Sequence, residues 1–189
     1  FIDFPLAAVG HKIGGPGKVS VIASGLFGSI SGSAIANTVS TGSFTIPMMK
    51  RAGFKPHIAG GIEPAASIGG MFMPPIMGAG GFIMAELTGV PYSKIMLVAI
   101  FPAMMYFFSV FVMVHYEAKK TNIVGEKQAE GAMVILKREW YYLLPLILIT
   151  GFMLFGYSAG YSAIVGLISC IVISWFRKET RIDLKGFLE

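Results

Sequence analysis

Two long apolar segments of this sequence are each interrupted near the middle by residues that weaken a helix. Residues 19–49 carry Ser31-Gly32-Ser33, and residues 58–86 carry Gly69-Gly70 and Pro74-Pro75. Glycine and proline disfavour helix interiors, and interrupted backbone inside a bilayer must find its hydrogen-bond partners in protein or in a cavity. Two such interruptions close together in sequence are typical of an ion or substrate site near the middle of a membrane.

The composition agrees with a membrane setting. The chain has 189 residues, of which 54% are hydrophobic and 13% charged, whereas soluble domains carry about 25% charged residues. Basic residues on cytoplasmic loops explain the net charge of +5 better than nucleic-acid binding does, because no recognition module is present. The single cysteine, Cys170, excludes a disulfide framework or a cysteine metal site within this chain.

The length of the first interrupted segment predicts a re-entrant helical hairpin. Residues 19–49 contain no charged residue; they exceed the ~20 residues of one membrane span but are too few for two spans and a turn. We expect limbs at residues 19–30 and 34–49. At 1.5 Å per residue the first limb extends ~18 Å, past the middle of a ~30 Å hydrocarbon core. The preceding Gly-Gly-Pro-Gly-Lys run, residues 14–18, predicts a turn at the membrane edge.

The remaining segments predict an all-α, multi-pass membrane protein. The chain begins with Phe1 and has no signal peptide, so we interpret it as a piece of a longer protein. We expect a transport-domain fragment at 1–120 (hairpin 19–49, broken helix 58–86, span 95–116), a cytoplasmic connection at 121–139, and two further spans with a basic cytoplasmic tail at 140–189.

The basic residues favour the hairpin over a full span. With a hairpin, every lysine and arginine except Lys94 falls on one side of the membrane. With a full span, Lys12 and Lys18 would move to the other side. Because cytoplasmic loops are enriched in lysine and arginine, we expect the hairpin mouth and the C-terminal tail to be cytoplasmic.

The two interruptions together offer oxygen ligands for a monovalent cation. Hydroxyl and amide oxygens are available from Ser31, Ser33, Asn37 and Ser67, and backbone carbonyls are expected to be free around Gly32, Gly69 and Gly70. Unwound backbone and half-helix ends bind Na⁺ in transporters of this style. The alternative is purely structural, because small residues also let membrane helices pack closely and serines bond neighbouring helices.

Glu63 is the single acid well within a predicted span, and ionisable groups there are usually functional. It either couples protons, holds a hydroxyl of the ion shell, pairs with a residue outside this chain, or is a protonated, hydrogen-bonded core residue. An intramembrane serine hydrolase is the alternative from another class. Against an enzyme, Ser31 lacks the glycine two residues earlier that a nucleophile elbow requires, and no histidine falls at membrane depth.

Several spaced motifs resemble the large membrane subunit of tripartite ATP-independent periplasmic (TRAP) transporters. They are Ser31-Gly-Ser-Ala-Ile-Ala-Asn37, Gly42-Ser-Phe-Thr-Ile-Pro-Met-Met-Lys50, Glu63-Pro-Ala-Ala-Ser-Ile-Gly-Gly70 and Met73-Pro-Pro-Ile-Met-Gly-Ala79. Glu63 and the Pro-Pro-Ile-Met-Gly run resemble the branch with fused small and large subunits, which is paired with TAXI-type binding proteins. The match runs to about Lys120 and is looser beyond it.

The resemblance implies Na⁺-driven uptake of organic acids, handed over by a soluble extracytoplasmic binding protein, with an elevator motion and no cofactor besides the coupling ion. It places Ser31, Ser33, Asn37, Ser67 and Gly70 at a sodium site. It places the substrate near Asn37, Thr38, Pro74 and Pro75, and we add Glu63 to that group. Many members carry Asp in place of Asn37 and Thr in place of Glu63. The alternative within transporters is a divalent-anion/Na⁺ symporter without a soluble partner.

Overall fold

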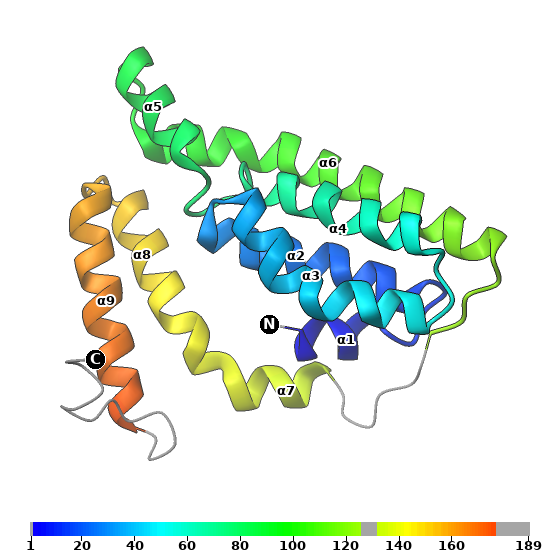
Figure 1. The fold of residues 1–189 in the computed structure, drawn as a ribbon. Helices are drawn as coiled ribbons and strands as arrows, with labels where there is room; N and C mark the ends of the chain where they lie inside the picture. The colour runs from blue at the N-terminus through cyan, green and yellow to red at the C-terminus, as the bar shows by residue number, and fades with distance from the viewer. Residues whose placement is uncertain (1, 126–131, 177–189) are drawn as a thin grey trace. The chain divides into compact units, whose positions relative to one another are not determined.

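The computed structural model describes residues 2–125 and 132–176, and this part of the chain is helical with no strand (Figure 1). The all-α prediction is therefore confirmed. The chain divides into two compact units, Phe1–Leu136 and Lys137–Glu189, which we describe separately. In chain order the described elements are α1 (Asp3–Val9), α2 (Gly15–Ser31), α3 (Ala34–Arg51), α4 (Pro56–Gly70), α5 (Ala79–Thr88), α6 (Tyr92–Lys120), α7 (Ala132–Glu139), a 3-10 helix (Trp140–Leu143), α8 (Leu144–Leu154) and α9 (Ala159–Phe176).

Helices α2 and α3 form a tight helical hairpin at the centre of the first unit. Gly32 ends α2 in the left-handed conformation (φ 62°), and its N–H donates to the carbonyl of Gly28 at 2.9 Å. Ser33 then caps α3, because its hydroxyl accepts a hydrogen bond from the N–H of Ala36 at 3.3 Å. A glycine at the helix end and a serine at the next helix start are the residues that such a turn requires.

The start of α2 corrects the turn predicted at residues 14–18. The turn is confined to Gly14 (φ 67°), and the helix begins at Gly15. Proline in a first helical turn is favoured, because the N–H it lacks has no partner there, and Pro16 occupies that turn. Gly17 lets α6 approach closely, since a Cβ atom there would lie 2.7 Å from a methyl group of Val114.

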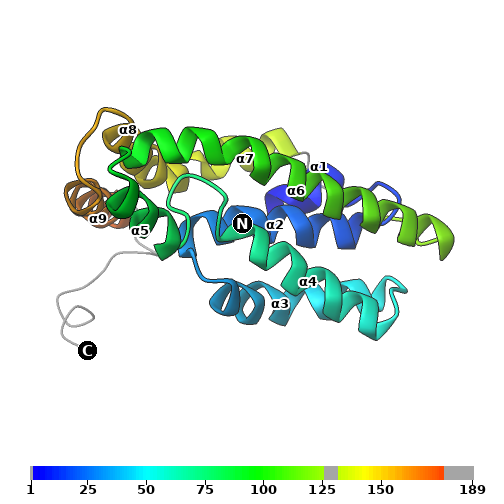
Figure 2. The ribbon, with the colours of Figure 1, turned by 90° about the horizontal axis from the view of Figure 1, so that it is seen from above.

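The core of the first unit lies between the hairpin, α4 and α6, and Figure 2 shows these helices from above. Its buried side chains include Val21, Met49, Ile62, Ala66 and Val114. Ala59, Ala66 and Ala118 also belong to this core, and small residues of this kind let membrane helices pack closely.

The second interrupted segment consists of α4 and α5, separated by residues 71–78 without regular helix. This connection meets the hairpin turn. The N–H of Ile76 donates to the carbonyl of Ser29 at 3.1 Å, and a Cβ atom on Gly32 would lie 2.2 Å from the carbonyl oxygen of Met77. The two interruptions recognised in the sequence therefore lie in contact.

Helix α6 runs the length of the first unit. Near its start the hydroxyl of Tyr92 donates to the carbonyl of Ile76, and just beyond its end the carbonyl of Ile123 accepts from the N–H of Gly14 at 3.0 Å. At 1.5 Å per residue its 29 residues extend about 44 Å, and its most apolar window has a mean hydropathy of 2.3. Among the described residues it is the one helix long and apolar enough to cross a membrane.

The second unit pairs α8 with α9, two shorter apolar helices. Aromatic rings gather where they are joined: Phe152, Tyr157 and Tyr161 have ring centroids 5.2–5.8 Å apart. The first of the two predicted spans was expected to begin at residue 140. Residues 140–143 form the 3-10 helix instead, and the α-helix begins at Leu144. The predicted basic tail, residues 177–189, and part of the predicted connection, residues 126–131, lie outside the described residues.

Candidate functional site

Glu63 lies at the junction of α2, α3 and α4 with no exposed surface. Four hydroxyl groups donate close hydrogen bonds to its carboxylate. Ser24 and Thr41 donate to Oε1, and Ser20 and Thr45 donate to Oε2. Hydrogen bonds to a carboxylate are stronger than those between neutral groups, so this cluster ties the hairpin to α4.

The four hydroxyl partners were not predicted, although the sequence contains a signal for them. Ser20 and Ser24 are four residues apart, as are Thr41 and Thr45. Residues at this spacing share one face of a helix. Two hydroxyl pairs on consecutive helices, followed by one buried acid, would have indicated the cluster. Because both carboxylate oxygens accept hydrogen bonds from α2 and from α3, Glu63 holds the two limbs of the hairpin together.

Asn37 lies beside this cluster and is also fully buried. Its side-chain Nδ2 donates to the carbonyl of Ser24 at 2.8 Å. Its Oδ1 lies 3.1 Å from the hydroxyl oxygen of Thr41. The amide therefore bridges the two limbs of the hairpin and faces the same threonine as Glu63.

Gly28 and Gly70 bring α2 and α4 together next to Asn37. A Cβ atom on Gly70 would lie 2.6 Å from Cα of Gly28 and 3.3 Å from Nδ2 of Asn37. Ser67, one turn before Gly70, is buried with its hydroxyl 3.5 Å from Oε1 of Glu63. The structure thus gathers three of the predicted ion ligands, Asn37, Ser67 and Gly70, around one point.

The other predicted ion ligands lie elsewhere. Ser31 and Ser33 are exposed at the hairpin turn, and Ser33 uses its hydroxyl oxygen to cap α3. Gly32 packs against residues 77–78. Gly69 faces α6, because a Cβ atom there would lie 2.7 Å from the ring of Tyr106. The turn residues therefore form a second group, in contact with the connection between α4 and α5.

The predicted substrate residues lie partly at the surface. Thr38, Pro74 and Pro75 are half-buried. The hydroxyl of Tyr92 lies 3.3 Å from the carbonyl of Pro75 and donates to Ile76, which fixes the connection to the start of α6. These positions line the turn side of the hairpin, whereas Glu63 is enclosed by hydroxyls.

A basic pair lies at the opposite end of α2, at the hairpin mouth, where Lys18 is buried and His115 is half-buried. The amine of Lys18, which is 4% exposed, lies 3.0 Å from Nδ1 of His115 and 5.2 Å from the ring centre of Phe111. Burial, and secondarily the charge of Lys12, lower the pKa of the Lys18 amine. His115 thus has a specific partner in the Lys18 amine.

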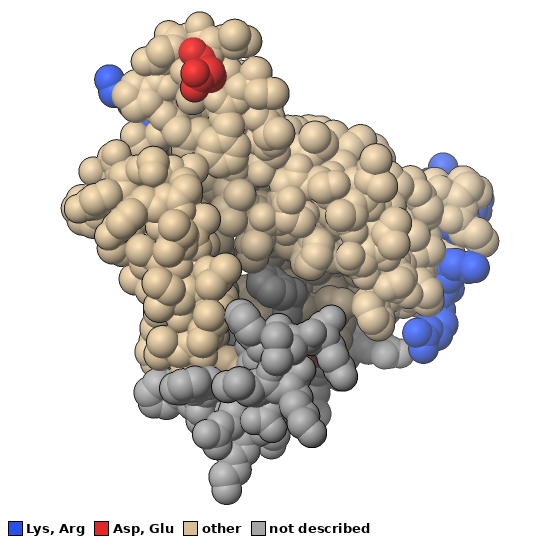
Figure 3. Space-filling view, turned by 60° about the vertical axis from the view of Figure 1, so that its left-hand side comes forward, with Lys and Arg blue, Asp and Glu red and all other residues tan. Residues whose placement is uncertain are grey.

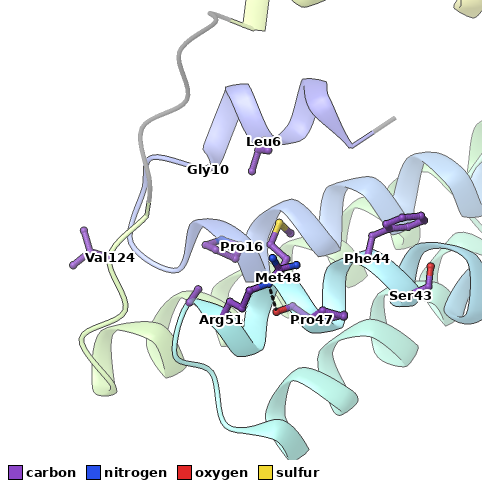
Figure 4. A pocket seen from close by; sticks show the side chains of 10 residues that line it. Leu6, Gly10, Pro16, Ser43, Phe44, Pro47, Met48, Arg51 and Val124 are labelled. Carbon is purple, nitrogen blue, oxygen red and sulfur yellow. Dashed lines mark hydrogen bonds between the residues drawn. The ribbon is translucent and has the colours of Figure 1, made fainter.

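An open cavity of about 860 Å³ lies between α1 and α3 (Figure 4). Its lining is mainly apolar, with Leu6, Phe44 and Met48 among its side chains. Arg51 supplies one guanidinium group, whose Nε donates to the carbonyl of Pro47 at 3.4 Å. None of the predicted ion or substrate residues lines this cavity, so the candidate site is the buried cluster of the hairpin.

Comparison with known proteins gives the family. Residues 1–189 match the family described as "Tripartite ATP-independent periplasmic transporter, DctM component". A putative TRAP transporter large permease protein of Haemophilus influenzae is 29% identical over 93% of this chain and 41% of its own length. The 2,3-diketo-L-gulonate TRAP transporter large permease protein YiaN of Escherichia coli is 30% identical over 80% of this chain and 36% of its own length.

The sialic acid TRAP transporter permease protein SiaT of Haemophilus influenzae is 30% identical over 92% of this chain and 28% of its own length. The chain thus spans less than half the length of each of these relatives. Proteins of the matching family are transporters and not enzymes, which removes the intramembrane hydrolase alternative. The chain belongs to the family of DctM components of tripartite ATP-independent periplasmic transporters.

Proposed function

We propose that this chain is part of the permease of a Na⁺-coupled secondary active transporter that imports organic acids. The substrate class is supported by two relatives, whose names give 2,3-diketo-L-gulonate and sialic acid, both of which are organic acids. In this proposal an extracytoplasmic binding protein delivers the substrate, and a small membrane subunit, fused in the full-length chain, completes the permease. The protein lies in the cytoplasmic membrane of a prokaryote, with the hairpin mouth and C-terminal tail in the cytoplasm.

One observation carries the proposal: the hairpin turn and the helix break are in contact, and a buried amide and two close-packed glycines lie behind them. This arrangement fits a cation held by oxygens, because unwound backbone and half-helix ends hold Na⁺ in transporters. We assign Asn37, Ser67 and the backbone of Gly69 and Gly70 to the inner side of the ion site. The turn residues Ser31, Gly32 and Ser33 contribute its outer side, and Thr38, Pro74 and Pro75 face the substrate.

The hairpin and α4 have the internal cohesion that an elevator motion requires. In such a motion a transport domain moves as a rigid body, so its elements must be held more firmly to one another than to their surroundings. Glu63 and its four hydroxyl partners join α2, α3 and α4. We propose that these helices move together.

The test is uptake by the full-length protein in liposomes, with its binding protein outside. Wild type should need an inward Na⁺ gradient, and K⁺ should not replace Na⁺. Asn37→Ala and Ser67→Ala should weaken the Na⁺ dependence. Ser43→Ala, an exposed position on α3, is the matched control and should behave as wild type.

Each alternative predicts a different result. Na⁺ dependence untouched by both variants would remove the site assignment. Uptake that persists without the binding protein would favour a symporter that works alone. Thermal unfolding of each purified variant separates loss of an ion ligand from loss of the fold.

A further inference from the structure

The side-chain amide of Asn37 has a fixed orientation. Its Nδ2 donates to the backbone carbonyl of Ser24 at 2.8 Å, so the nitrogen side faces α2 and Oδ1 faces Thr41. An amide oxygen accepts through two lone pairs. Among the described residues, the hydroxyl of Thr41 is the one side-chain donor within reach of Oδ1.

The hydroxyl of Thr41 has several acceptors but a single proton. Its oxygen lies 2.8 Å from the backbone carbonyl oxygen of Asn37, 3.1 Å from Asn37 Oδ1 and 3.1 Å from the hydroxyl oxygen of Ser24. Oε1 of Glu63 also accepts a hydrogen bond from this hydroxyl. A hydrogen bond to a carboxylate is roughly twice as strong as one between neutral groups, so the proton points to Glu63.

The hydroxyl of Ser24 does not donate to Asn37 Oδ1 in place of Thr41. Its hydroxyl also donates to Oε1 of Glu63, so one carboxylate oxygen takes the protons of both neighbours. Asn37 Oδ1 is then a buried acceptor without a proton. A buried acceptor in this state is unfavourable unless something else satisfies it, and a cation does so without needing a proton.

We propose that Glu63 is a positioning residue: its carboxylate holds the proton of Thr41 away from Asn37 and so keeps Oδ1 free to bind the coupling cation. This inference rests on the proposed function, because it concerns the same ion site. It gives a role to the fully buried acid at position 63. Glu63 acts through Thr41 and does not itself touch the ion.

The decisive experiment is a double-mutant cycle between Glu63 and Thr41 in the full-length protein. Glu63→Gln keeps the size of the side chain but removes the charge that attracts the proton, so Thr41 is free to donate to Asn37. We expect the Na⁺ concentration for half-maximal effect to rise about tenfold, the change that a loss of one such interaction produces. Thr41→Val removes the hydroxyl and should leave Na⁺ affinity close to that of wild type.

The cycle distinguishes positioning from a general structural role. In the Thr41→Val background, Glu63→Gln should no longer change Na⁺ affinity, because the proton it releases is absent. Ser43→Ala is the control, since Ser43 is exposed on α3 and its hydroxyl donates to the backbone carbonyl of Ser40, and it should leave Na⁺ affinity unchanged. Two measurements serve: Na⁺-dependent uptake, and the rise of the thermal unfolding midpoint with Na⁺ in detergent, which reports binding without transport.

The outcomes separate this inference from the proposed function. If wild type responds to Na⁺ and Glu63→Gln weakens that response equally with and without the Thr41 hydroxyl, Glu63 acts on the fold and the inference is overturned. A Glu63→Gln variant with unchanged Na⁺ affinity overturns it as well. If wild type shows no response to Na⁺ in either measurement, the proposed function and the inference both fail.

Discussion

Gly70 occupies a place where a single methyl group has no room. A Cβ atom there would lie 2.6 Å from the backbone of Gly28, which moves only if the two helices separate. We expect Gly70→Ala to lower the free energy of unfolding by about 1–3 kcal/mol, the range for overpacking. Gly60→Ala, in the same helix with nothing within 4 Å of the added atom, should raise it by up to about 1 kcal/mol, since alanine favours helix. Denaturant unfolding in detergent measures both, and equal effects would show that α2 and α4 are not tightly packed there.

Lys18 should make stability depend on pH in a defined direction. Burial lowers the pKa of its amine below the ordinary lysine value of 10.5. Between the lowered pKa and 10.5 the unfolded chain binds more protons than the folded one, so stability rises with pH across that window. Relative to Lys18→Met, wild type should therefore gain stability as pH increases toward 10.5. Thermal unfolding of wild type and Lys18→Met across this pH range tests the prediction, and Lys55→Met is the control for losing one lysine. If the stability of wild type relative to Lys18→Met falls as pH rises, the prediction is contradicted.

At this scale the sequence predicted acceptors better than donors. Asn37 and Ser67 stand out because amides and hydroxyls are unusual beside glycine pairs in apolar segments. Thr41 and Thr45 do not stand out, because threonine in a membrane helix commonly bonds its own backbone, and both hydroxyls here also lie within reach of the carbonyl four residues earlier. Their convergence on Glu63 depends on how α3 is rotated against α4, which a packed structure determines.

The turn that joins α2 and α3 should be sensitive to an added side chain beyond ordinary backbone strain. Gly32 and Gly89 both end helices in the left-handed conformation, with φ 62° and φ 66°. A non-glycine residue in this conformation costs roughly 1–2 kcal/mol. Around Gly89 there is open space, whereas a Cβ atom on Gly32 would meet the carbonyl of Met77 at 2.2 Å.

Gly32→Ala is therefore expected to destabilise the protein by clearly more than Gly89→Ala, which pays only the backbone term. It should also weaken uptake, because the turn and the helix break would be forced apart. Thermal unfolding together with liposome uptake measures both effects. If the two variants lose the same amount of stability and of uptake, the contact between the hairpin turn and the helix break contributes to neither.

Helix lengths and breaks were predictable because they depend on local residues. The uncharged stretch between Lys18 and Lys50, with its small residues in the middle, predicts two helices and a turn, and the structure has α2 and α3 there. The run at residues 14–18 was interpreted as a turn, but only Gly14 has a turn conformation (φ 67°), and Gly17 lies inside α2, where it packs against Val114 of α6. A glycine that serves a close contact and one that serves a turn look alike until the partner helix is known.

Within the first unit, most basic residues lie near one end of α6 and few lie near the other. One end gathers the hairpin mouth and the end of α6, where Lys119 and Lys120 lie in the last turn. The other end gathers the hairpin turn, the break and the start of α6 with Lys94. Figure 3 shows most blue side chains at one end, beyond a broad uncharged surface. This division is what the positive-inside rule requires of a hairpin that enters and leaves on the cytoplasmic side.

Single cysteines at the two ends of this division test the topology. In a Cys170→Ser background of the full-length protein, Lys12→Cys and Lys94→Cys each place one thiol at a position that is exposed in the structure. In right-side-out vesicles an impermeant maleimide should label position 94 and spare position 12 until the membrane is opened with detergent. Labelling of position 12 from outside would mean that residues 19–49 do not return to the side they entered from. We expect this result because α6, at 29 residues, extends about 44 Å against a ~30 Å hydrocarbon core, which is long enough to place its two ends in different aqueous phases.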